Sequence, residues 1–199
     1  MIEINNISKA LPYKYFKQYF DKAISNNQEN LEAVSISSLD LNSMEVESRF
    51  VNLKYINHDK WIFFTNYNSP KSKAFDTHDQ VSALFYWNKI NTQIRMKAKI
   101  EKCTVSLSDQ HFAKRSHEKN AIAVSSKQSE AIESYEMVIN NYKEVLNNNA
   151  ILSSRPESWG GFSFTPYYFE FWEGSDFRLN KRVSYSLVNS KWVKAYLQP

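Results

Sequence analysis

Apolar and charged residues alternate most regularly along the chain over positions 94–101 (IRMKAKIE). A period of two is typical of a strand with one face buried and the other exposed. Residues 81–87 are almost continuously apolar and predict a buried strand. Shorter apolar runs predict further strands over residues 33–36, 49–56, 61–66, 162–164, 169–172, 183–188 and 192–197.

Helical spacing appears in fewer places. A helix is predicted to begin at Leu11 and Pro12 and to end near residue 26, because its apolar residues recur at three- and four-residue intervals. Ser69 followed by proline predicts a short helix, and another is expected over residues 106–117. Ser129 is predicted to cap a further helix ending at residues 147–149. Its apolar stripe is expected in the core and comprises Ile132, Tyr135, Val138, Ile139, Tyr142, Val145 and Leu146.

Many short strands with few helices, and no regular alternation of the two, favour a mainly β fold with some α structure. We expect an antiparallel β-barrel with peripheral helices. The length of 199 residues suits one domain spanning residues 1–199. Its first ten residues are expected to be flexible, and residues 39–47 are polar and predict a turn.

Composition and motifs exclude several classes of function. The net charge of +4 is mild and no run of Lys or Arg is present, so we expect no nucleic-acid partner, whereas small anionic ligands fit a basic chain. Cys103 is the only cysteine, and the start of the chain lacks a signal-peptide pattern, which favours the cytoplasm. No apolar run is long enough for a membrane span. We expect no metal site, and no hydrolase or P-loop motif occurs.

The last third of the chain concentrates unusual residues. All three glycines lie between residues 160 and 174, and Arg178 and Arg182 follow a Trp-containing strand. Glycine serves where a side chain does not fit or where φ is positive. Paired guanidinium groups suit phosphate or carboxylate, so the segment suggests a flat aromatic ligand with anionic groups. A hairpin with solvent-exposed arginines explains the same segment equally well.

Several motifs in order resemble those of the pyridoxamine 5′-phosphate oxidase family. They are RFVNLK at residues 49–54, FFTNYNSPK at 63–71, TQI at 92–94, SKQS at 126–129, WGGF at 159–162, FEFWEG at 169–174 and RLNKR at 178–182. The likeness extends from about residue 11 to residue 199. It implies an FMN-binding split β-barrel that forms homodimers, with the FMN at the dimer interface and residues 159–199 as the C-terminal dimerisation region.

The resemblance also implies site residues. Arg49 and Lys71, helped by Thr65, would bind the FMN phosphate. The full set of FMN-binding positions is Arg49, Phe50, Val51, Asn52, Leu53, Lys54, Phe64, Thr65, Ser69, Lys71, Gln93, Gln128, Ser129, Trp172 and Arg182. Arg178 would be the catalytic residue that holds substrate near the flavin. The substrate-binding positions are Lys54, His111, Arg115, Lys119, Arg178 and Asn180.

The implied reaction is oxidation of pyridoxamine or pyridoxine 5′-phosphate to pyridoxal 5′-phosphate, with O2 as acceptor and hydrogen peroxide as product. Five positions depart from the family pattern, where Pro70 and Thr92 each replace an arginine, His111 a tyrosine, Lys119 a serine and Asn180 a histidine. Two alternatives therefore stay open. One is an FMN-dependent oxidase of another anionic ring compound, such as a phenazine-precursor-like carboxylate. The other is a non-catalytic protein that binds flavin or pyridoxal phosphate.

Overall fold

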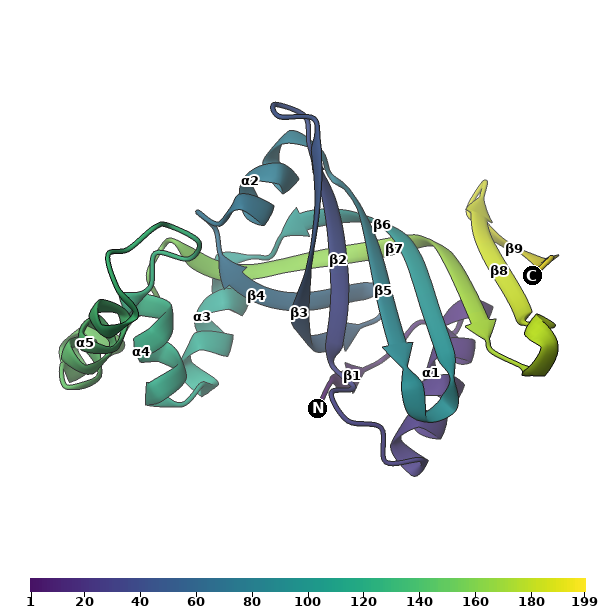
Figure 1. The fold of residues 1–199 in the computed structure, drawn as a ribbon, viewed down its shortest axis with the longest axis horizontal. Coiled ribbons are helices and arrows are strands. Elements are labelled where there is room, and N and C mark those ends of the chain that lie inside the picture. Colours follow the sequence, from purple (N-terminus) through teal and green to yellow (C-terminus); the bar gives the residue numbers. More distant parts are fainter.

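The computed structural model describes residues 1–199, except for the side chain of Asn149. Figure 1 shows a barrel of strands with helices at one end, above it and below it. The strands are β1 (Glu3–Asn5), β2 (Ala33–Asp40), β3 (Glu45–Asn57), β4 (Lys60–Asn66), β5 (Gln80–Trp87), β6 (Thr92–Lys102), β7 (Trp159–Glu173), β8 (Lys181–Val188) and β9 (Lys191–Leu197). The α-helices are α1 (Leu11–Ser25), α2 (Pro70–Thr77), α3 (Val105–Lys114), α4 (His117–Ser125), α5 (Tyr135–Leu146) and α6 (Asn149–Leu152).

The strands form one mixed sheet in the order β1-β3-β2-β5-β6-β7-β8-β9, with β4 paired to both β3 and β7. All pairings are antiparallel except that of β1 with β3. The contact of β4 with β3 begins only at Leu53 opposite Phe63. The half of β3 before Leu53 therefore has β2 on one side and no strand on the other, so the barrel is split along that edge.

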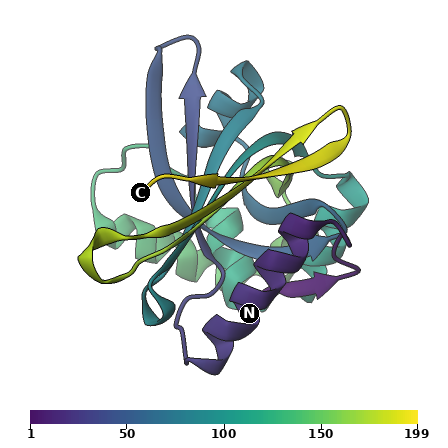
Figure 2. The same cartoon turned by 90° about the vertical axis from the view of Figure 1, so that its right-hand side faces the viewer.

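The alternating strand is confirmed as β6, in which Ile94, Met96 and Ala98 are fully buried while the charged residues between them face outward. Aromatic side chains fill the core from several elements. Helix α1 packs Phe16 against Trp61 at a centroid distance of 4.5 Å, and Tyr13 against Phe169 at 5.1 Å. Figure 2 shows this helix lying across the open end of the barrel, with the β8–β9 hairpin above it. The helix predicted to begin at Leu11 therefore covers one end of the hydrophobic core.

Several predicted boundaries are wrong. Residues 39–47 are not one turn, because β2 continues to Asp40 and β3 begins at Glu45. The helix expected over residues 106–117 is α3, which ends at Lys114, and the separate helix α4 that begins at His117 was not predicted. Their caps are Thr104 and Ser116, which accept hydrogen bonds from the N–H groups of Leu107 and Lys119. The strands expected at 162–164 and 169–172 are the single strand β7.

The first ten residues, expected to be flexible, are anchored in the structure. Ile2 is 5% exposed within the core, and β1 pairs in parallel with β3 from Glu3 opposite Tyr55 to Asn5 opposite Asn57. A parallel pair of three residues is short, so the buried side chain contributes much of the attachment.

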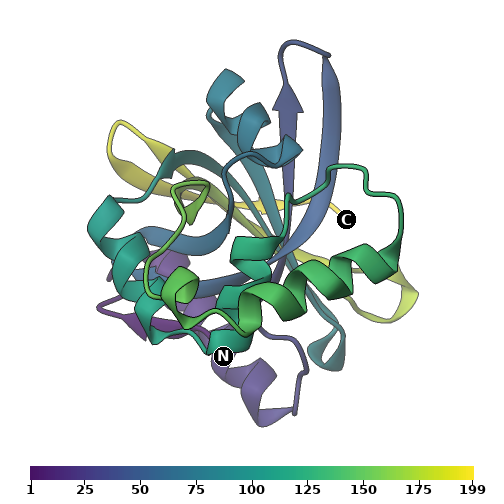
Figure 3. The same ribbon diagram turned by 90° about the vertical axis from the view of Figure 1, so that its left-hand side faces the viewer.

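The apolar stripe that was expected in the core lies on α5, apart from Ile132, which precedes this helix. The prediction that the stripe is buried is wrong for a single copy of the chain. No residue of α5 is buried, and Tyr135 is 78% exposed. The helix begins after Ser134, which caps it, rather than after Ser129. Figure 3 shows α5 in front of α4, on the side of the molecule away from the barrel core. The helical spacing therefore predicted a helix with an apolar face, but not what covers that face.

No helix among the described residues is both long and apolar enough to cross a bilayer.

Candidate functional site

A cavity of about 990 Å³ lies where the unpaired half of β3 faces α2, α3 and the loop after α4. It brings together most of the residues that the sequence assigned to one site. They are Arg49, Phe50, Val51, Asn52, Lys54, Phe64, Thr65, Lys71, His111, Arg115, Lys119, Gln128 and Ser129. The backbone N–H and C=O groups along this edge of β3 have no strand partner. A planar ligand with alternating donors and acceptors could therefore pair with them as a strand does.

At one end of this cavity, the start of α2 holds a buried lysine. Lys71 is 5% exposed, and its Nζ donates to Ser69 Oγ at 2.9 Å. Burial, aided by the nearby charge of Arg49, lowers the pKa of Lys71 to about 8. Among the described residues no carboxylate forms an ion pair with Lys71. A buried cation without an acidic partner is costly, so the site is prepared for an anionic ligand.

Arg49 reaches the same end of the cavity from β3. Its Nη1 donates to Ser38 Oγ at 2.9 Å, and its Nη2 pairs with Glu47 Oε2 at 2.6 Å. Glu47 lines the cavity too and is largely exposed. Pro70, next to Lys71, contributes neither a charge nor an N–H. The anion-binding end therefore contains two cations, one of which is already paired.

The other end of the cavity is built around His111 of α3. Its ring stacks on Phe64 with centroids 3.8 Å apart, and its Nδ1 lies 2.7 Å from the hydroxyl of Tyr55. Burial, together with the charges of Arg115, Lys54 and Lys114, lowers the pKa of His111 to about 4. The imidazole is therefore neutral at pH 7, when it offers one donor and one acceptor rather than a charge.

The cations at this end belong to Lys54, Arg115, Lys119 and Lys114, all of which line the cavity. The Arg115 guanidinium lies 4.4 Å from the centre of the Trp159 ring, and its Nη2 donates to the backbone carbonyl of Lys119 at 2.7 Å. Its Nη1 is buried without a hydrogen-bond partner, and burial lowers the pKa of this residue. A cluster of positive charges around a neutral histidine favours a ligand with a strongly anionic group.

The wall between the two ends is polar. Thr65 Oγ1 donates to Gln128 Oε1 at 3.2 Å, which ties β4 to the loop after α4. Two of the residues assigned from the sequence belong to elements that border this cavity, β3 and the start of α2, but do not line it. The side chain of Leu53 is fully buried in the core, and Ser69 is fully buried as the cap of α2, where its hydroxyl donates to Asn66 O at 2.8 Å. Ser69 thus acts on the cavity through Lys71.

Two of the glycines have a steric purpose. A Cβ on Gly160 would lie 2.2 Å from the hydroxyl of Tyr67, and a Cβ on Gly161 would lie 2.9 Å from Phe64. No glycine has a positive φ. The glycines therefore permit close packing of β7 behind the wall of the cavity, which is one of the two explanations that the sequence left open.

A second cavity, of about 290 Å³, lies near the other end of β7. It contains the remaining FMN positions Gln93, Trp172 and Arg182, which are neighbours across β6, β7 and β8. It also contains Arg95 and Glu170, which the sequence did not single out. In the sequence, Arg95 and Glu170 alternate with apolar residues, as solvent-exposed residues of a strand do. The pairing of β6 with β7 is what places both of them in the cavity.

Arg178 and Asn180 lie in the turn between β7 and β8 and line neither cavity. Arg178 is exposed, and both it and Phe177 have positive φ values, of 61° and 58°. Asn180 Oδ1 accepts a hydrogen bond from the N–H of Ser175 at 3.2 Å, so it closes the turn. The Asn180 position thus has a structural use in addition to the substrate contact predicted for it.

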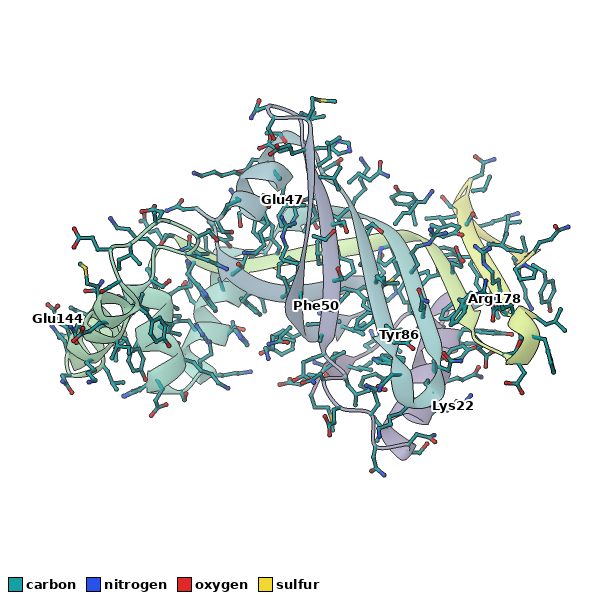
Figure 4. The ribbon with its side chains drawn as sticks, in the orientation of Figure 1. Lys22, Glu47, Phe50, Tyr86, Glu144 and Arg178 are labelled. Carbon is teal, nitrogen blue, oxygen red and sulfur yellow. The ribbon has the colours of Figure 1, made fainter. Side chains whose placement is uncertain are left out.

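The predicted site is therefore divided between two ends of the molecule. Thr65 in the first cavity pairs with Gly160, and Trp172 in the second lies twelve residues further along β7. At about 3.3 Å per residue this is roughly 40 Å of strand. Figure 4 shows Arg178 on the side of the barrel opposite α3, α4 and α5, with the exposed Phe50 and Tyr86 on the sheet between.

Comparison with known proteins identifies relatives over nearly the whole chain. The family model for the pyridoxine 5′-phosphate oxidase C-terminal dimerisation region matches residues 159–199. A pyridoxine/pyridoxamine 5′-phosphate oxidase of Neisseria meningitidis is 30% identical over 188 residues, covering 94% of this chain and 89% of the relative. The enzyme of the same name from Actinobacillus pleuropneumoniae is 31% identical over 190 residues, covering 96% and 90%.

Solved structures share the fold. PhzG from Burkholderia lata, crystallised with tetrahydrophenazine-1-carboxylic acid, superposes with a TM-score of 0.89 at 24% identity, covering 96% of this chain and 93% of that one. A pyridoxamine 5′-phosphate oxidase-related, FMN-binding protein from Nostoc punctiforme gives a TM-score of 0.74 at 10% identity, covering 92% and 97%. The expected split β-barrel with peripheral helices is confirmed.

Proposed function

Because the chain belongs to the pyridoxine/pyridoxamine 5′-phosphate oxidase family, we propose that it is an FMN-dependent oxidase of pyridoxamine or pyridoxine 5′-phosphate. The products would be pyridoxal 5′-phosphate and hydrogen peroxide, with ammonia as well from the amine. The family makes the protein an FMN-dependent oxidoreductase. The identity of the substrate is the proposed part, and it rests on the cationic end of the large cavity.

The residues of the large cavity fit FMN. A phosphate dianion suits the buried Lys71, which has no acidic partner, and Arg49 adjoins it. The unpaired edge of β3 supplies backbone groups for the polar edge of a flavin ring, and Gln128 supplies an amide. When bound, FMN would accept two electrons from the substrate and pass them to O2.

The protein groups would bind and orient the substrate. Lys54, Arg115 and Lys119 would hold its phosphate, and the neutral His111 would donate or accept one hydrogen bond there without repelling the cations. Arg178 would hold the substrate from the other side, against the flavin. Because these cations would fix the phosphate, they would also fix the position of the substrate carbon that is oxidised.

The division of the site is the observation that carries the proposal of a homodimer. Gln93, Trp172, Arg182 and Arg178 lie at the opposite end of β7 from the phosphate-binding residues. Two copies related by a twofold axis would place this end of one subunit against the large cavity of the other. Each site would then contain residues of both subunits, and Phe50 and Tyr86 would be covered.

Mixing two inactive variants tests the shared site. Arg115→Ala and Arg178→Ala should each abolish turnover as homodimers, and Arg178→Ala should retain FMN. A mixed dimer has one site with both arginines and one with neither. Random mixing makes half of the dimers mixed, so activity should return to about a quarter of the wild-type value. A tag on one variant verifies that the subunits have exchanged. If activity does not recover although mixed dimers have formed, the site is not shared between subunits in this way.

Anaerobic titration tests the substrate. Addition of pyridoxamine 5′-phosphate should bleach the flavin absorbance near its long-wavelength band, and oxygen should restore it. A second candidate is another anionic ring compound, favoured by His111 and Asn180 at substrate positions and by the fold of PhzG. A flavin that stays oxidised with pyridoxamine 5′-phosphate but bleaches with a reduced tricyclic carboxylate would support this candidate instead. Bound FMN with no reduction by either compound would favour the non-catalytic protein.

A further inference from the structure

The second cavity contains an unusual buried acid. Glu170 of β7 is 5% exposed, and both of its oxygens are occupied. Oε1 accepts from Nε and Nη2 of Arg182 at 3.0 and 2.7 Å, and Oε2 accepts from Arg95 and from the hydroxyl of Tyr168. Burial raises the pKa of Glu170, but the hydrogen bonds from Arg182, Arg95 and Tyr168 outweigh burial and lower it. The carboxylate is therefore charged and holds two guanidinium groups.

Strand register explains this arrangement. Arg95 of β6 stands directly opposite Glu170, and Arg182 of β8 stands opposite Trp172, two residues further along β7. Side chains in these positions share one face of the sheet. That face also carries Gln93 and Trp172, which are opposite each other. The acid thus lies in the same row of side chains as the proposed flavin contacts.

Arg182 has little freedom left to move. Nε and Nη2 are bound to Glu170, and Nη1 donates to the carbonyl of Gln198 at 2.8 Å. The charged side chains that line the cavity are Arg95, Arg182 and Glu170, and their charges sum to one positive charge. Removing the acid would both release Arg182 and double that charge.

We infer that Glu170 is a positioning residue of the flavin site, which fixes Arg182 and, with Arg95, sets the positive charge beside the flavin ring. The inference rests on the proposed function, because it takes Gln93, Trp172 and Arg182 as flavin contacts. Reduction of a flavin adds negative charge to the ring. A more positive cavity therefore favours the reduced form and raises the midpoint potential, and a less positive cavity lowers it.

The sign of the potential change distinguishes this role from a structural one. Spectroelectrochemical titration of the FMN-loaded protein should show a higher midpoint potential for Glu170→Gln, where the cavity charge rises to two. Arg95→Gln brings the charge to zero and should lower the potential. The double variant restores a charge of one and should return close to the wild-type value. If the two substitutions acted only through lost packing, they would not shift the midpoint potential in opposite directions, because both break the same ion pair.

Glu173→Gln is the matched control. Glu173 lies on the same strand and is also paired, with Tyr19 Oη at 2.7 Å and with Lys181, but it does not line the cavity. Its potential should equal that of the wild type. Should Glu170→Gln fail to fold, Arg95→Gln still decides, because a lowered potential supports the inference and an unchanged one overturns it.

Two failures can be told apart. A wild-type protein that binds no FMN would overturn the proposed function and this inference together. A wild type with bound FMN, whose potential is unchanged or shifts in the same direction in both Glu170→Gln and Arg95→Gln, would overturn this inference and leave the function intact.

Discussion

The buried Lys71 predicts that FMN affinity falls as the pH rises above 8. Its ammonium is 5% exposed and has a pKa of about 8, against an ordinary value near 10.5. One pKa unit corresponds to about 1.4 kcal/mol, so burial costs the charged form on the order of 3 kcal/mol. A phosphate dianion would stabilise the ammonium and raise its pKa, so binding takes up a proton wherever the free protein has lost it.

The expected magnitude follows from this linkage. Below pH 8 the lysine is already charged, and FMN affinity should change little between pH 7 and 8. Above pH 8 the affinity should fall about tenfold per pH unit, until the pH reaches the raised pKa of the complex. The free protein should show the opposite trend. Between pH 8 and 10.5 the unfolded chain binds more protons at Lys71 than the folded chain does. The contribution of Lys71 to the free energy of unfolding therefore increases as the pH rises.

Quenching of FMN fluorescence on titration of the apoprotein measures the dissociation constant from pH 7 to pH 9.5. Lys71→Arg is the control, because a guanidinium keeps its charge over this range and its curve should be flat. The reasoning is refuted if wild-type affinity is constant up to pH 9.5, or if Lys71→Arg shows the same fall.

Pro70→Arg adds a cation beside Lys71 and should tighten FMN binding by about tenfold, measured by the same quenching; an unchanged constant would mean that the phosphate lies elsewhere. Ser190→Gly should raise the free energy of unfolding by roughly 1 kcal/mol in urea, because Ser190 has a φ of 63°, whereas Ser186→Gly within β8 should lower it. Cys103, whose pKa burial raises to about 11, should react with iodoacetamide at pH 7.5 at least tenfold more slowly when folded than in urea, and equal rates would contradict that pKa.

Local patterns in the sequence predicted most of the strands because strand period depends only on which face is buried. The alternation that became β6 specified its inward face residue by residue, and the confirmed barrel followed from many such segments. The α5 stripe shows the limit of the same reasoning. Helical spacing reports an apolar face, but its burial depends on neighbours far away in sequence or in another chain.

The site was predictable only in part for a related reason. Motif resemblance identified Arg49, Lys71 and His111, which the structure places in one cavity. It matched Glu170 within FEFWEG at residues 169–174 but gave that residue no role, since an acid in an alternating strand looks like a solvated residue. Its importance depends on the register that sets Arg95 opposite it, and register is a tertiary property.

Exposed aromatic residues connect the two halves of the site. Phe50 is 75% exposed and Tyr86 55%, and both extend from the sheet that lies between the two cavities. Cross-strand pairs of Phe50 with Ser35, and of Ser35 with Leu84, place Phe50 and Tyr86 on one face of that sheet. Apolar side chains on such a face are costly in water, unless another surface covers them. The proposed second copy would remove this cost and complete the site in one step, so FMN binding and dimer formation should strengthen each other.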